Sequence, residues 1–161
     1  MKSKTSYFNA VIFKKNISHY WPVWVLFLCY LFVVLPVNIW AAATNAYYFE
    51  NMPAAVRNHQ IIGSAVRMAI TPAPIFLFAA VMALAVFSYL YTAKNANAIH
   101  ALPVNRLELF ITNYLSGLLF LLVPEILAFV AAVMVSLTNQ ITSIEYLFWW
   151  LLCVGGVSFF A

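Results

Sequence analysis

The sequence of 161 residues predicts an all-α protein, a polytopic bundle of transmembrane helices. Hydrophobic residues make up 66% of the chain and charged residues only 7%, which leaves too few polar side chains to cover a water-soluble domain. Several uninterrupted apolar runs also reach the length of about 20 residues that a helix needs to cross a bilayer. We therefore expect lipid to cover most of the surface.

Four spans are predicted from these runs and from the prolines and charges that bound them: residues 21–43, 73–92, 107–137 and 144–161. Pro72 and Pro74 suit the start of the second helix, because the first amide groups of a helix have no partner within it. The fourth run is still apolar at Ala161, with no polar flank. We expect an N-terminal fragment of a longer protein, with a complete four-helix protein as the alternative.

Residues 1–20 are predicted to form a separate unit in front of the transmembrane domain 21–161. Tyr7, Phe8, Val11 and Ile12 fall on one side of a helix, which is typical of an amphipathic helix at the lipid headgroups; a solvated tail is the alternative. The segment holds four lysines and no acid, which predicts a cytoplasmic amino end. A cleaved signal peptide is less consistent, because its apolar region spans only about 7 to 15 residues.

The sequence has few residue patterns that would indicate catalysis or the binding of nucleic acid, a cofactor or a metal. The net charge of +4 is divided among separate loops, so it indicates topology and no nucleic-acid partner. The glycines form no phosphate-binding loop, and the histidines are isolated from one another, so we expect no cofactor, no metal and no enzyme activity. Cys29 and Cys153 lie in separate spans and are predicted to be packing residues.

Glu125, preceded by Pro124, is a carboxyl group inside the third span. A charge at this depth costs about 2.5 to 3.5 kcal/mol, so we expect the side chain to face the bundle interior, a partner or water. It is the candidate intramembrane functional residue. The alternatives are a hydrogen bond to a neighbouring helix and a place near the outer interface. Pro124 predicts a kink.

The loop between the second and third spans is cytoplasmic by alternation and has a small apolar face. Ala98, Ile99 and Leu102 form that face, while Lys94 and His100 remain polar. This pattern suits a short helix in the groove of a cytoplasmic partner. An ordinary connection between helices is the alternative.

The stretch from Ser88 to Gly117 resembles the segment after the second helix of ABC-2-type transporter permeases, the membrane subunits of bacterial ABC exporters. Its most specific feature is the run H-A-L-P-V-x-R, from His100 to Arg106. The resemblance implies a cytoplasmic coupling helix that contacts a separate ATPase subunit, which binds the ATP. The coupling residues are then Lys94, Ile99, His100, Leu102, Pro103 and Arg106.

The same resemblance implies a location in the bacterial inner (plasma) membrane and a second permease subunit, as a homodimer or heterodimer. Such permeases usually have six or more spans, which agrees with a truncated chain. The predicted function is therefore an ABC transporter permease subunit that forms the translocation path. The alternative is a non-transporting membrane scaffold or immunity-type accessory protein. A membrane-embedded enzyme would need paired acids, clustered histidines or an activated nucleophile.

Overall fold

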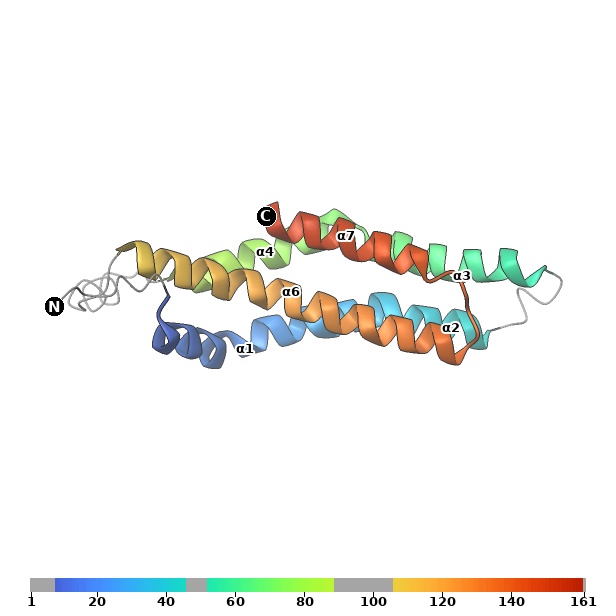
Figure 1. Cartoon of the computed structure of the whole chain (residues 1–161), viewed down its shortest axis with the longest axis horizontal. Coiled ribbons are helices and arrows are strands. Elements are labelled where there is room, and N and C mark those ends of the chain that lie inside the picture. Colours follow the sequence, from blue (N-terminus) through green and yellow to red (C-terminus); the bar gives the residue numbers. More distant parts are fainter. Residues whose placement is uncertain (1–7, 46–51, 89–105, 161) are drawn as a thin grey trace.

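The computed structural model describes residues 8–45, 52–88 and 106–160. The elements assigned there are helices (Figure 1): α1 Ala10–Phe32, the π-helix η1 Val33–Val37, α2 Asn38–Thr44, α3 Ala54–Ala69, α4 Pro72–Val86, α6 Arg106–Thr138 and α7 Glu145–Phe160. The predicted all-α class is thereby confirmed.

Two helices are long and apolar enough to cross a membrane. One is the continuous run Ala10–Thr44 of 35 residues, which joins α1, η1 and α2, and the other is α6, of 33 residues. The pair α3 and α4 would make a third, bent by 41° at its break, while α7 is apolar but shorter. The fold is thus compatible with membrane insertion.

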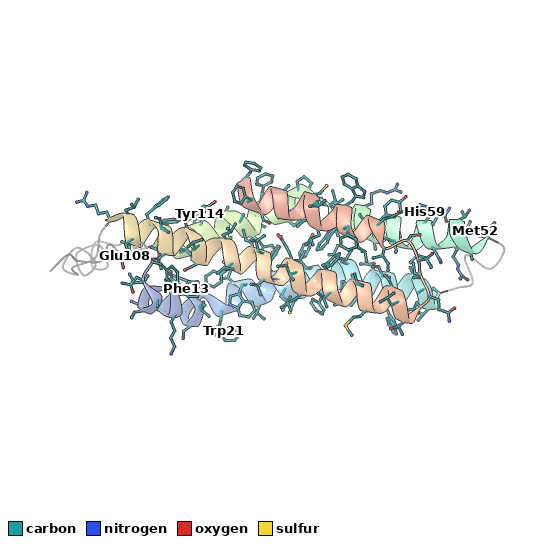
Figure 2. All side chains as sticks on the ribbon, in the orientation of Figure 1. Phe13, Trp21, Met52, His59, Glu108 and Tyr114 are labelled. Atoms are coloured by element: carbon teal, nitrogen blue, oxygen red, sulfur yellow. The ribbon has the colours of Figure 1, made fainter. Side chains whose placement is uncertain are left out.

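The helices form an elongated bundle in which α1 packs chiefly against α6. Both begin at the same end of the bundle (Figure 1), and we call the opposite end, formed by residues 42–44 and 139–141, the turn end. Helix α3 begins at the turn end, and α7 runs back from it along α6. In Figure 2, His59 and Met52 mark the turn end, and Phe13 and Glu108 mark the other.

Helix α1 runs unbroken from Ala10 through Tyr20 into the range of the predicted first span, with no break between the two predicted units. The side chain of Asn9 caps it by accepting hydrogen bonds from the amides of Val11 and Ile12, at 3.1 and 3.2 Å. Asn16 then holds the first turns of this helix against α6 through buried hydrogen bonds. Residues 1–7 lie outside the described residues.

The middle of the first span contains the π-helix η1, which surrounds Pro36. Proline lacks an amide hydrogen and clashes with the carbonyl one turn earlier, and the wider turn of the π-helix relieves that clash here. Nδ2 of Asn38 donates to the carbonyl oxygens of Val33 and Val34, at 2.9 and 3.1 Å. A side chain thus satisfies backbone groups next to the proline, as a helix in hydrocarbon would require.

The segment between the first two predicted spans, Thr44 to Thr71, contains helix α3. This helix packs against α2, η1 and α7, and its buried face supplies Ile61, Ile62, Ala65 and Ala69 to the core. Helix α4 then covers the range Pro72–Val86, within the predicted second span. The remainder of that span, from residue 89 onward, lies outside the described residues.

A tight turn after α6 reverses the chain into α7. Gln140 has a positive φ of 57°, the amide of Ile141 donates to the carbonyl of Ser136 at 2.9 Å, and that of Gln140 donates to Leu137 at 3.1 Å. These two bonds form a Schellman motif, in which the left-handed residue ends the helix. Ile141 is buried beside it, which fixes where α7 begins its antiparallel course.

The outer surface is largely apolar, as a lipid-facing surface requires. Leu26 and Leu84, for example, are 63% and 60% exposed. Cys29 and Cys153 are also exposed, so the prediction that they pack in the core is wrong: they occupy the outward faces of α1 and α7. Pro124, where a kink was predicted, does not interrupt helix α6, which runs from Arg106 to Thr138.

Candidate functional site

Glu125 lies fully buried between α6 and α7. The hydroxyl of Ser158 on α7 donates a hydrogen bond to its Oε1, whereas Oε2 has no hydrogen-bond partner. Gly155 lies one turn before Ser158 and faces Oε2. A Cβ atom at this position would lie 3.8 Å from Oε2, which is an ordinary van der Waals distance. One carboxyl oxygen of Glu125 therefore has a hydrogen-bond partner and the other has none.

A cavity of about 160 Å³ lies beside this contact, among α4, α6 and α7. Ser158 lines it and also bonds Glu125, so it connects the carboxyl group to the cavity. Asn113 and Tyr114 also bring polar groups to its wall, while Met82 and Gly117 belong to its apolar lining. The wall is thus mostly apolar with few polar groups, which is typical of small-molecule sites.

A second polar cluster joins α1 to α6 near the ends where both helices begin. Nδ2 of Asn16 donates to Oδ1 of Asn113 at 2.8 Å and to the hydroxyl of Ser116 at 3.3 Å. The amide of Asn9 donates to the hydroxyl of Thr112 at 3.0 Å. These side chains have partners throughout, so the cluster serves to orient two spans.

The outward face of α3 carries a polar stripe beside the exposed Val56 and Met68, although the helix packs against the first candidate span. Gln60, Ser64 and Arg67 are exposed at spacings of four and three residues, which places them on one face. Arg67 lies about 15 Å along the axis from Arg57, and the helix contacts η1 in the middle of the first span. Lipid against this face would have to solvate a guanidinium group at depth, which is costly.

Most of the predicted coupling residues cannot be placed. Lys94, Ile99, His100, Leu102 and Pro103 lie outside the described residues, and Arg106 is the exposed first residue of α6. At the edge of this gap, the hydroxyls of Tyr20 and Ser88 form a hydrogen bond of 3.0 Å, which ties the end of α4 to α1.

Within residues 8–45, 52–88 and 106–160, no three His, Cys, Asp or Glu side chains gather as a metal site would require. His59 instead contacts Tyr146 edge-on, with ring centroids 5.0 Å apart.

Sequence reasoning identified Glu125 but missed its partner Ser158, the pair of Asn16 and Asn113, and the polar face of α3. The spacing of Gln60, Ser64 and Arg67 was the one local signal available, because it shows a polar stripe at helical period. The partners of Glu125 and Asn16 depend on contacts between distant segments. No protein-family model, curated protein or solved structure matches this chain.

Proposed function

We propose that this chain is the membrane-spanning permease subunit of an ABC-2-type transporter, which forms a translocation path and docks a separate ATPase subunit. The observation that supports a translocation path is the polar face of α3, which lies beside the first span. This face consists of Gln60, Ser64 and Arg67. The ATPase contact rests on the resemblance of the segment from Ser88 to Gly117.

The polar face of α3 favours transport over a purely structural role. A scaffold in lipid needs polar contacts between its own helices, of the kind that Asn16 makes to Asn113. It has no need for a charged side chain directed away from its core at span depth. We propose that this face lines an aqueous path, with a second permease subunit on the opposite side.

The contact between Glu125 and Ser158 is proposed as the point at which α7 moves relative to α6. It is a single hydrogen bond, and the adjacent cavity leaves room for α7 to shift. Closure of the ATPase dimer would press on the coupling loops and tilt the spans, which shifts the population toward an open path. The permease contributes the path and its partner the ATP hydrolysis.

The path is tested by cysteine accessibility in a chain freed of its two native cysteines. Ser64→Cys should react at least tenfold faster with a charged, water-borne thiol reagent than Leu84→Cys, because only a thiol in water ionises to the reactive thiolate. Leu84 is a suitable control, since it is 60% exposed on an apolar helix. Equally slow labelling of both would refute an aqueous path along α3.

The ATPase contact is tested in the loop. Changing Ile99 and Leu102 together to Asp should leave membrane insertion intact but abolish co-purification of ATP-hydrolysing activity. Two buried aliphatic side chains contribute about 1.5 to 3 kcal/mol each, so the affinity should fall at least about a hundredfold. The matched control changes Asn95 and Asn97 to Asp, which adds the same charge at polar positions. If no ATPase accompanies the unaltered chain, the scaffold alternative replaces this proposal.

A further inference from the structure

A second, more polar cavity lies at the turn end of the bundle, apart from Glu125 and its cavity. Its volume is about 180 Å³, and it is a partly open cavity lined by α2, the first turns of α3 and the turn after α6. A single water needs about 10 to 15 Å³ of such space, so a group of several non-hydrogen atoms fits. The lining residues are Ala42, Ala43, Arg57, Asn58, Ile61, Asn139 and Ile141.

Asn58 is the first indication of a ligand. Its side chain lines the cavity and is only 6% exposed, yet its Oδ1 has no hydrogen-bond partner. Buried polar atoms in native structures are nearly always paired, with protein, water or ligand. An amide oxygen accepts hydrogen bonds, so the missing group is a donor.

Arg57 indicates that the ligand also carries a negatively charged group. It is the charged residue of the described lining, and no carboxyl group lines the cavity with it. The residue is half-buried, and a guanidinium group presents several N–H donors in the geometry that suits phosphate. Nδ2 of Asn139 donates to the carbonyl of Val135, at 2.8 Å. Its Oδ1 is therefore the atom that can accept a hydrogen bond from a ligand. The cavity therefore offers one anion-binding group beside two amide oxygens.

The position of the cavity indicates where such a ligand comes from. Ala42 and Ala43 end the apolar run of the first span, and Trp40, just before them, is 56% exposed. Outward tryptophans at the end of a span are typical of the headgroup region. At this level the most abundant molecule with a phosphate and a nitrogen donor is a lipid.

We propose that this cavity, which we call the Arg57 pocket, binds the headgroup of an aminophospholipid. The phosphate lies on the guanidinium group of Arg57, and the primary ammonium group donates to Oδ1 of Asn58 and of Asn139. The proposal does not depend on the transport function. It distinguishes phosphatidylethanolamine from phosphatidylcholine of equal acyl chains, because the quaternary ammonium of choline has no N–H to donate.

The experiment titrates the detergent-solubilised full chain with these two lipids and counts bound lipid by native mass spectrometry. Phosphatidylethanolamine should bind at least about tenfold more tightly than phosphatidylcholine, since even one of the two hydrogen bonds from the ammonium group implies that difference. Asn58→Ala should reduce that preference, because only Oδ1 of Asn139 then accepts from the ammonium group, and Arg57→Gln should weaken both lipids about tenfold. Arg67→Gln, the same change on the same helix but outside the pocket, should alter neither affinity.

Equal affinity for the two lipids, or equal effects of Arg57→Gln and Arg67→Gln, would overturn the proposal. Competition by soluble phosphoethanolamine as strong as that by the lipid would assign the pocket to a free solute instead of a membrane lipid. Because Asn58 is buried, Asn58→Ala is compared with the unaltered chain by circular dichroism. Arg57, at a half-buried position, tests the pocket even if the Asn58 variant fails to fold.

Discussion

Replacement of Glu125 by methionine, a side chain of similar volume without polar atoms, should make this protein more stable. In the native structure Oε2 is buried without a partner, and such an atom costs about 1 to 3 kcal/mol. The substitution also removes the hydrogen bond from Ser158, which contributes about 0.5 to 1.5 kcal/mol. The released hydroxyl can turn to a carbonyl of its own helix.

The difference of the central values predicts that Glu125→Met raises the free energy of unfolding by about 1 kcal/mol. In a chain of this size that is a rise of about 2 to 4 °C in Tm, measured by thermal unfolding of the full chain in detergent. Ser158→Ala should have the opposite effect and lower stability by about 1 to 3 kcal/mol, because it leaves both carboxyl oxygens unpaired. The double variant should match Glu125→Met alone within about 0.5 kcal/mol.

A loss of more than about 1 kcal/mol in Glu125→Met would refute this reasoning, because the carboxyl group would then be a net structural contact. A gain in stability, together with a loss of transport, would instead indicate that the carboxyl group is retained for function at the expense of stability.

Three further tests, of the turn after α6, the Asn16 cluster and the surroundings of Glu125, use the same measurement. Gln140→Gly should raise stability by about 0.5 to 1 kcal/mol, because glycine adopts the positive φ of 57° without strain; a loss would contradict the Schellman assignment. Asn16→Leu should lower it by about 1 to 3 kcal/mol, since the Oδ1 of Asn113 loses its donor, and adding Asn113→Leu should recover part of that loss. Gly155→Ser should exceed Gly156→Ser in stability, because only the former brings a hydroxyl near the unpartnered carboxyl oxygen; equal stabilities would argue against this geometry.

The sequence alone was sufficient to locate the long helices. The predicted third span, 107–137, corresponds to α6, Arg106–Thr138, whereas the range of the fourth, 144–161, contains the apolar but shorter helix α7, Glu145–Phe160. Length and apolarity are local properties, and a helix in hydrocarbon satisfies its backbone within itself. The first span needed one correction, because its helix extends back to Ala10.

Local pattern could not show where α3 packs. Its polar residues, from Arg57 to Arg67, resemble those of an exposed loop, and only its contacts with η1 and α7 place it in the bundle. Its buried face is a stripe of small and aliphatic residues that any neighbour of the right shape could cover. The bend of 41° between α3 and α4, together with the turn after α6, determines that α3 packs against η1 and α7.

The polar pairs were decided entirely by tertiary structure. Ser158 is 33 residues from Glu125, and Asn113 is 97 residues from Asn16. Each helical residue turns the side chain by about 100°, so the rotation of one helix against another determines which polar groups meet and which, like Oε2 of Glu125, remain unpaired. Sequence showed that a carboxyl group in this span needs a partner, but the packing of α7 on α6 selected that partner and left the second oxygen without one.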